Sequence, residues 1–388
     1  MSEQSIAEKI LLAIRATLNG TEGRFSLHEP KFSEKESVYI QDCMDSGFVS
    51  SVGKYVDRFE QMLAEYTGVR RAVAVVNGTS ALHTALSLMG VGQNDEVLVP
   101  ALTFVATANA VTYTGGLPHF IDCDEETLGV DPLKLENYLG DICQTGTQGC
   151  KNRLTGRRIK AIVVTHTFGH PVDLDPIEDL CRRFGLVLIE DAAEAIGSLY
   201  KGSHVGNRGD LSILSFNGNK TITTGGGGAL LCNDDALGDL AKHVTTTAKV
   251  PHPWSYVHDR IGYNYRMPNI NAALGCGQLE QLPSFIERKR SLARRYAAAF
   301  KAVPAVRFFQ EPEYARSNYW LNAILLDTSI QDSRDDVLTL TNRQGIMTRP
   351  VWTLMHKLPM YQKNPRMDLT TSESIEKRLI NIPSSPIL

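Results

Sequence analysis

Short apolar runs alternate with helical patterns along residues 70–232, and this alternation constrains the fold more than any other feature of the chain. The runs are rich in aliphatic and β-branched residues and apolar on both faces, which is typical of buried parallel strands. They are AVAVV (72–76), EVLVP (96–100), PHFIDCD (118–124), KAIVVTH (160–166), LVLIED (186–191), LSILSF (211–216) and GALLC (228–232). The alternation predicts an α/β fold with a mostly parallel sheet covered by helices.

The rest of the chain predicts a smaller body beside this sheet. Residues 1–27 have the pattern of a short amphipathic helical extension, and residues 28–255 would form the large domain. From residue 256 to 388, a long helical stretch and mixed strand and helix patterns predict a smaller C-terminal α/β domain. The polar, glycine-rich segment 140–158 interrupts the alternation, so we expect a surface excursion there.

Composition excludes several classes of protein. The 388 residues are 43% hydrophobic and 21% charged, which allows a large core and excludes a wholly disordered chain. The net charge of −3 lacks the basic excess of a nucleic-acid binder, and we expect no membrane span and no signal peptide. Seven cysteines is an odd number, which excludes a complete disulfide framework, and the absence of a C-x-x-C pair leaves a zinc ribbon unsupported. We expect reduced thiols in a cytoplasmic protein.

The most informative side chain is Lys220, in SFNGNKTITTGGGGALL (215–231). A lysine beside glycines suggests a P-loop, but Asn219 and Leu214 occupy the two positions where that motif requires glycine. No G-x-G-x-x-G follows a predicted strand, which also disfavours a dinucleotide site. Lys220 follows a buried strand, at the edge where α/β proteins bind ligands. Its amine could form a Schiff base with pyridoxal 5′-phosphate; the alternative is a solvated lysine in a turn.

Pyridoxal phosphate chemistry also requires an acid that pairs with the pyridinium nitrogen of the cofactor. Asp191 ends the predicted strand 186–191, at the same edge of the sheet as Lys220. A carboxylate there would keep the ring protonated, so that the ring could withdraw electrons from the reacting carbon. The alternative role for Asp191 is a helix N-cap, and the two roles are compatible.

The cofactor further requires phosphate donors and a stacking group. Gly78, Thr79 and Ser80 begin a predicted helix directly after a strand, and a helix N-terminus offers free amides and the positive end of a dipole. Ser215 could add a hydroxyl from the strand before Lys220. Phe104, just after strand 96–100, could stack on the ring, although most such aromatics belong to the core.

Several motifs together resemble the fold-type-I, pyridoxal phosphate-dependent sugar aminotransferases of the DegT/StrS family, from about Leu27 to the C-terminus. They are NGTSAL, PALTFVATANAV, EDAAEAIGS, SFNGNKTITTGGGGAL and GYNYRMPNINAALG. A second set resembles the branch that aminates a nucleotide-linked 4-keto-6-deoxy amino sugar for legionaminic acid and related surface glycans. It comprises GFVSSVGKYVDRFE, HTFGHP and TRPVWTLMHKLPMY.

The resemblance implies a role for each matching residue. Lys220 would bind the cofactor covalently and then carry the proton, while Asp191 would pair with the pyridinium. Glu194 falls where the family places a side chain near the 3-hydroxyl of the ring, and Ser215 takes the phosphate. Asn264, in GYNYRM, would reach the phosphate of the neighbouring subunit, which implies a homodimer with shared active sites.

The resemblance also implies the reaction. L-glutamate would donate the amino group, and the acceptor would be a nucleotide sugar, with UDP-4-keto-6-deoxy-N-acetylhexosamine as the favoured substrate. A GDP-linked sugar or a 3-keto sugar is an alternative acceptor. A non-catalytic regulator or sensor with the same fold is an alternative from another functional class, which an intact Lys220 and Asp191 disfavour.

Other polar residues have weaker signals. His166 and His170 are four apart, but they follow a strand rather than lying on a helix, so we expect no metal site. His166, at a strand end, could face the active site or be an ordinary loop histidine. Arg349 and Trp352, in TRPVW, could bind the carboxylate of the donor or pack on the sugar; a surface pair in the small domain is the alternative.

Overall fold

The computed structural model describes residues 4–18, 23–146 and 149–388. Within them, a nine-stranded sheet has the central order β1-β11-β10-β7-β6-β2-β3. These strands are β1 (Arg71–Val75), β2 (Glu96–Pro100), β3 (Leu117–Ile121), β6 (Arg158–Thr165), β7 (Val187–Asp191), β10 (Leu211–Ser215) and β11 (Gly228–Cys232). Strands β3, β2, β6, β7 and β10, which are neighbours in that order, run parallel. Strand β11 is antiparallel to both of its neighbours, β10 and β1. The predicted α/β fold with a mostly parallel sheet is confirmed.

Helices α2 and α3 precede the first strand, and α4 to α8 come between or after the strands of this sheet, as the alternation predicts. They are α2 (Glu34–Ser46), α3 (Lys54–Thr67), α4 (Gly78–Leu88), α5 (Val105–Tyr113), α6 (Pro132–Ile142), α7 (Leu174–Phe184) and α8 (Asp235–Thr245). Helix α4 packs against α5 and α8, whereas α3 packs against the long helix α9 (Asn269–Phe300). The sheet and these helices share one large hydrophobic core.

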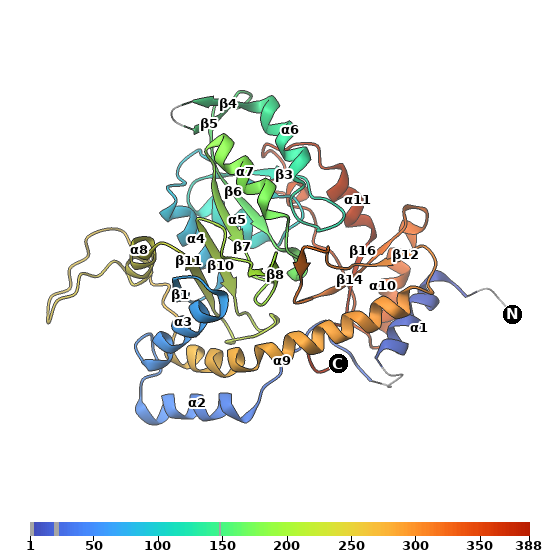
Figure 1. Cartoon of the computed structure of the whole chain (residues 1–388), viewed down its shortest axis with the longest axis horizontal. Coiled ribbons are helices and arrows are strands. Elements are labelled where there is room, and N and C mark those ends of the chain that lie inside the picture. Colours follow the sequence, from blue (N-terminus) through green and yellow to red (C-terminus); the bar gives the residue numbers. More distant parts are fainter. Residues whose placement is uncertain (1–3, 19–22, 147–148) are drawn as a thin grey trace.

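A smaller four-stranded sheet has the order β12-β14-β16-β15. Its elements are β12 (Val306–Phe308), β14 (Asn322–Leu326), β15 (Arg349–Pro350) and β16 (Leu379–Ile382), with α10 (Arg334–Arg343) and α11 (Thr370–Arg378) nearby. A third, short sheet has the order β13-β8-β9, from β8 (Leu199–Tyr200), β9 (Ser203–His204) and β13 (Ala315–Arg316). Figure 1 shows α9 running from the large sheet to this smaller body.

The predicted N-terminal extension contains helix α1 (Ile6–Thr17). Ser5 and Glu8 form a capping box at its N-terminus. Its buried face packs against α9 and α10, in the same hydrophobic cluster as β14 and β16. The extension therefore adds to the core of the smaller body. The domain boundaries at residues 27 and 255 stay predictions.

The described residues of segment 140–158 are mostly exposed or half-buried, and they include two strands that the sequence pattern did not indicate. Strands β4 (Cys143–Gly146) and β5 (Gly149–Asn152) form a hairpin, and β5 pairs with β6 to extend the large sheet. A disulfide joins Cys143 to Cys150 across the hairpin, so the expectation that all thiols are reduced is wrong. The polar sequence concealed this pairing because an edge strand with one exposed face needs few apolar residues.

Two features are absent from the described residues. None of their helices combines the length and apolarity that crossing a membrane requires. No cluster of histidine, cysteine, aspartate and glutamate side chains in the same residues could hold a metal ion.

Candidate active site

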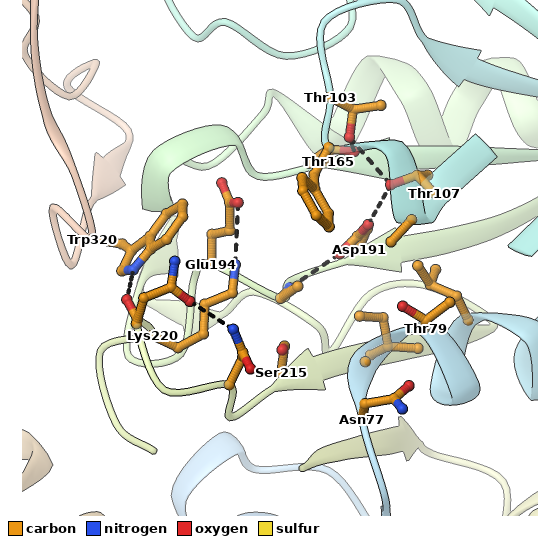
Figure 2. Close-up of a pocket in the computed structure, with 18 of the residues that line it drawn as sticks. Asn77, Thr79, Thr103, Thr107, Thr165, Asp191, Glu194, Ser215, Lys220 and Trp320 are labelled. Atoms are coloured by element: carbon orange, nitrogen blue, oxygen red, sulfur yellow. Dashed lines mark hydrogen bonds and ion pairs between the residues drawn. The ribbon is translucent and has the colours of Figure 1, made fainter. Parts of the chain in front are cut away.

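A cavity of about 350 Å³ lies at the carboxyl ends of the parallel strands (Figure 2). In an α/β sheet this edge is where ligands bind, because the loops that follow several strands meet there. Segments that follow β1, β2, β7 and β10 line the cavity, and two tryptophans from the smaller body, Trp320 and Trp352, complete the wall. The cavity therefore combines residues that are far apart in the sequence.

Lys220 lines this cavity at the end of a turn that follows β10. Its amide donates to the carbonyl of Asn217 at 2.9 Å, which closes the turn. Its Nζ donates to Oε1 of Glu194 at 3.2 Å and lies 3.9 Å from the centroid of the Trp320 ring. Only 13% of the lysine side chain is exposed, so its charge faces protein rather than solvent.

Asp191 also lines the cavity, as the last residue of β7. Its Oδ2 accepts a hydrogen bond from Thr107 Oγ1 at 2.8 Å, and its Oδ1 accepts one from the amide of Ala193 at 3.2 Å. Burial raises the pKa of the Asp191 carboxyl, and these two hydrogen bonds oppose the rise. A cationic ligand atom near this carboxylate would favour its ionised form.

Glu194 lies opposite the amine of Lys220. Its Oε2 accepts the amide of Phe168 at 2.8 Å, which leaves Oε1 for the lysine. Burial raises the pKa of the Glu194 carboxyl, and the charge of Lys220 opposes the rise. The cavity thus contains two carboxyl groups that burial shifts toward their neutral forms.

Helix α4 points its N-terminus at the cavity, where Gly78 and Thr79 line the wall. Their amides have no intrahelical acceptor because the helix begins there. The amide of Ser80 instead donates to Oδ1 of Asn77 at 2.7 Å, and Ser80 is buried outside the cavity wall. A Cβ atom on Gly78 would lie 3.0 Å from Cβ of Ser215, so the close approach of helix and strand favours glycine at this position.

The remaining predicted residues divide into two groups. Phe104 and Trp352 line the cavity, and their ring centroids lie 6.3 Å apart. His166 is fully buried and does not line the cavity, and its Nε2 hydrogen-bonds to Oε2 of Glu190 at 3.0 Å. His170 is also buried, and its ring packs against the rings of Phe309 and Tyr319 in the core.

Arg349 and Asn264 lie outside this cavity. The guanidinium of Arg349 donates to Oδ1 of Asn342 at 3.1 Å and to the carbonyl of Thr348 at 3.0 Å. Asn264 is exposed and accepts a hydrogen bond from Arg266 at 3.0 Å. Its predicted role across a subunit boundary stays a prediction, because that role belongs to a second chain.

Sequence reasoning missed Thr107 and Trp320. Thr107 lies in the first turn of α5, three residues after Phe104, so helical spacing could have placed it on the same side. Trp320 lies one hundred positions after Lys220. Its sequence context, YWLNAILLD, suggests only a core strand, so local patterns could not have found it.

The arrangement fits pyridoxal 5′-phosphate. A primary amine and a buried carboxylate share one cavity with a helix N-terminus whose first amides have no intrahelical acceptor. Gly78 leaves that helix end open to a close approach, and the hydroxyls of Thr79 and Ser215 lie on the same wall. These are the groups that hold an aldehyde, a ring nitrogen and a phosphate.

Comparisons with known proteins agree with this chemistry. The model of the DegT/DnrJ/EryC1/StrS aminotransferase family matches residues 30–388. GDP-perosamine synthase of Escherichia coli O157:H7 is 40% identical over 366 residues, which cover 93% of each chain. EpsN of Bacillus subtilis, named as a pyridoxal phosphate-dependent aminotransferase, is 38% identical over 337 residues, covering 86% of this chain and 83% of EpsN.

A solved structure supports the same assignment of the fold. Helicobacter pylori PseC, an aminotransferase involved in the biosynthesis of pseudoaminic acid, superposes with a TM-score of 0.84. The two sequences are 26% identical, and the match covers 93% of this chain and 94% of PseC. The large sheet and the smaller body are therefore those of the fold-type-I aminotransferases.

Proposed function

This chain belongs to the DegT/DnrJ/EryC1/StrS family of pyridoxal phosphate-dependent sugar aminotransferases, and on that premise we propose that it transfers an amino group from L-glutamate to a nucleotide-linked keto sugar. The observation that carries the proposal is that Lys220 and Asp191 line one cavity with the N-terminus of α4. An intact lysine suits amino transfer, because the transfer needs a nucleophilic amine that can also carry a proton.

Different residues of the cavity would bind different parts of the cofactor. Lys220 would bind its aldehyde carbon, and Asp191, oriented by Thr107, would pair with the ring nitrogen. The bound cofactor supplies an electron sink for the reacting carbon. The amides of Gly78 and Thr79 would bind the phosphate together with the hydroxyl of Ser215.

Three further side chains would act on the ring and the reacting atoms. Phe104 would stack on the ring from the cavity wall, and Glu194 would lie at the ring hydroxyl. Once its amine is free, Lys220 would move the proton between the two carbons that exchange the amino group. Trp320 and Trp352 form the wall of this part of the cavity on the side of the smaller body.

The relatives favour a GDP-linked 4-keto-6-deoxy sugar as the acceptor. Support comes from the 40% identity over nearly the whole chain with GDP-perosamine synthase. A second candidate is UDP-4-keto-6-deoxy-N-acetylhexosamine, for legionaminic acid or a related glycan. The support for this candidate is the resemblance of the TRPVWTLMHKLPMY segment to the branch that serves legionaminic acid and related glycans.

The charges of the cavity favour a homodimer with shared sites. Within the part of the chain that the structure describes, Lys220 is the one lysine or arginine that lines the cavity. A nucleotide diphosphate sugar and a cofactor phosphate need more positive charge than one amine supplies. The loop between α8 and α9 extends away from the body (Figure 1) and includes Lys249 and Arg260, while Arg266 lies at its base, where its backbone pairs with Val75 of β1. A second copy of this loop could supply the charge.

The apolar surface of the same loop also supports a second copy. Trp254, Tyr256 and Ile261 are 79%, 82% and 88% exposed. Large apolar side chains at this exposure are typical of an interface between chains. The loop therefore has both the apolar contacts and the cations that a shared active site would use.

Trapping the cofactor tests the core of the proposal. Borohydride reduction of the purified yellow protein should attach the cofactor to Lys220, as peptide mass spectrometry would report. Lys220→Ala should lose this attachment and lower kcat by at least about a thousand-fold, because both the covalent anchor and the proton carrier are gone. A wild-type protein that never binds the cofactor would refute the proposal.

A substrate panel tests the acceptor. We expect glutamate to convert the bound cofactor to its pyridoxamine form in a single turnover, and a GDP-linked 4-keto-6-deoxy sugar to reverse the conversion fastest. A faster reversal by the UDP-linked N-acetylated sugar would select the second candidate. A protein that binds the cofactor but shows no conversion would be a regulator or sensor instead.

A further inference from the structure

Trp320 covers the amine of Lys220 from the smaller body. The Nζ atom lies 3.9 Å from the centroid of the indole ring, within the range of a cation–π contact. Glu194 accepts a hydrogen bond from the same amine at 3.2 Å. Figure 2 shows the lysine amine between these two side chains, which come from different elements.

Hydrogen bonds hold the indole ring in this position. The indole Nε1 of Trp320 donates a hydrogen bond to the carbonyl of Asn219 at 2.7 Å. Asn219 directly precedes Lys220, and this bond therefore fixes Trp320 beside the lysine. Its carbonyl accepts a hydrogen bond from the buried amine of Lys289 at 3.1 Å. Only 4% of Trp320 is exposed. The ring is thus a rigid surface that faces the lysine.

The same segment orders the loop that carries Glu194. The side-chain amide of Asn318 donates to the carbonyls of Glu194 and Ile196, each at 2.9 Å. Its Oδ1 accepts the amide of Trp320 at 2.8 Å. Asn318 therefore links the backbone of Glu194 to the backbone of Trp320. This link fixes the distance between the two side chains that contact the lysine amine.

We propose that Trp320 is a positioning residue for Lys220: its indole face receives the lysine ammonium whenever this amine is not bonded to the cofactor. The inference rests on the proposed role of Lys220. Amino transfer requires that the lysine leave the cofactor and stay beside the reacting carbon, where it moves the proton. The indole and the carboxylate of Glu194 form a two-sided contact that keeps the amine in the cavity.

The physical basis is the cost of a free lysine side chain. A lysine has four rotatable bonds and would otherwise extend toward water, which would remove the proton carrier from the site. An ammonium over an aromatic face is attracted by the ring quadrupole, and desolvation strengthens this attraction. The contact needs both the ring and the charge, so replacing the ring while filling its volume isolates the effect.

The test compares Trp320→Phe with Trp320→Met. Both variants fill much of the space and lose the indole N–H, but only the phenylalanine keeps an aromatic face. Each holoenzyme is first converted to its pyridoxamine form with excess glutamate, so that Lys220 is free while the cofactor stays bound. Reductive methylation followed by peptide mass spectrometry then gives the labelling rate of Lys220.

We expect Lys220 to be methylated at least about three-fold faster in Trp320→Met than in Trp320→Phe, because the methionine variant releases the amine to solvent. Trp352→Met, a change in the same cavity wall without contact to the lysine, should leave the labelling rate of Lys220 at the wild-type value. The exposed Lys35 serves as an internal reference for labelling in every sample.

Equal labelling of Lys220 in the methionine and phenylalanine variants would overturn the inference, since the aromatic face would then have no effect. A merely structural role would change the stability of both variants without separating their Lys220 rates. Failure of the wild-type protein to convert with glutamate would remove the proposed function itself. That outcome is distinct, because it appears before any Trp320 variant is compared.

Discussion

At the scale of single residues, the site depends on carboxyl groups that folding removes from water. Asp191 and Glu194 line the cavity, and burial raises the pKa of each. Ionising a buried acid costs stability, and the binding of a cationic ring nitrogen would offset that cost. The ionised form of Asp191 would therefore stabilise the bound cofactor, whereas in the cofactor-free protein the same charge lowers the stability of the fold.

Asp191→Asn should stabilise the cofactor-free protein at neutral and higher pH. Because the folded pKa of Asp191 is raised, the stability associated with its proton is complete below the unfolded value and is lost as pH rises through the folded pKa. The amide cannot ionise, and Thr107 can accept as well as donate a hydrogen bond. Thermal unfolding from pH 4 to pH 8 measures the difference.

The difference in melting temperature between Asp191→Asn and wild type should grow from pH 4 toward pH 8. A difference independent of pH would contradict the assignment of a raised pKa. Thr107→Val is the matched control, because it removes the donor to Asp191 but leaves the carboxyl in place. This control should lower stability, since an oxygen of the buried carboxylate loses its partner.

Two neighbouring glycines should respond differently to the same substitution. A Cβ on Gly228 would lie 2.5 Å from the carbonyl carbon of Asn77 and 2.6 Å from the amide nitrogen of Gly78. The contact is with backbone, so Gly228→Ala must displace the turn that forms the predicted phosphate site. On Gly226, the nearest atom to a Cβ would be 3.9 Å away.

We expect Gly228→Ala to lower the free energy of unfolding by about 2 kcal/mol or more and to weaken cofactor binding. Gly226→Ala should change the free energy of unfolding by less than about 0.5 kcal/mol. Urea denaturation and cofactor titration measure both effects. If the two variants behave alike, the close approach of β11 to the α4 turn is not what requires glycine.

At the scale of elements, α1 shows how a segment can lie outside the family pattern and still belong to the core. The family model begins at residue 30, after this helix. Ile10 and Ile14 are fully buried against the smaller body, whereas Leu12 on the opposite face is 50% exposed. Arg295 also donates to the carbonyl of Thr17 at 2.8 Å, which fixes the end of the helix.

Ile14→Ala should lower the free energy of unfolding by about 2–4 kcal/mol, because it leaves a cavity between α1 and its neighbours. Leu12→Ala, on the exposed face, should change it by less than about 0.5 kcal/mol. Urea denaturation of both variants measures the difference. Similar small changes would show that α1 is not packed against the smaller body in solution.

At the scale of the whole molecule, the site requires two bodies of one chain and, in our proposal, a second chain. The large sheet supplies Lys220 and Asp191, and the smaller body supplies Trp320 and Trp352. Asn264, in the segment between α8 and α9, is exposed and does not line this cavity. Light scattering should therefore give about twice the chain mass of 42.8 kDa.

Mixing two inactive variants tests whether the sites are shared. Lys220→Ala removes the amine and Asn264→Ala removes the predicted contact from the neighbouring subunit. In a mixed dimer with shared sites, one site carries both changes and the other carries neither. Refolding an equal mixture should thus recover about a quarter of the wild-type activity, while each variant alone stays inactive. No recovery would place Asn264 outside the neighbouring site.

The sequence alone determined the parts of this protein that depend on local pattern. Buried strands read as apolar runs because both of their faces are covered, and residues at strand ends meet at one edge of a parallel sheet. These two regularities are sufficient to assign Lys220, Asp191, Gly78 and Thr79 to one site, and all four line the same cavity. The family motifs extended this prediction to the cofactor and to the class of reaction.

Only the tertiary structure decided what depends on contacts between distant segments. It placed His166 outside the cavity wall with a hydrogen bond to Glu190, paired the amide of Ser80 with the side chain of Asn77, and joined Cys143 to Cys150. It also brought Trp320 over Lys220. Side-chain direction and long-range pairing follow from how whole elements pack, and residues far apart along the chain carry no local signal of that packing.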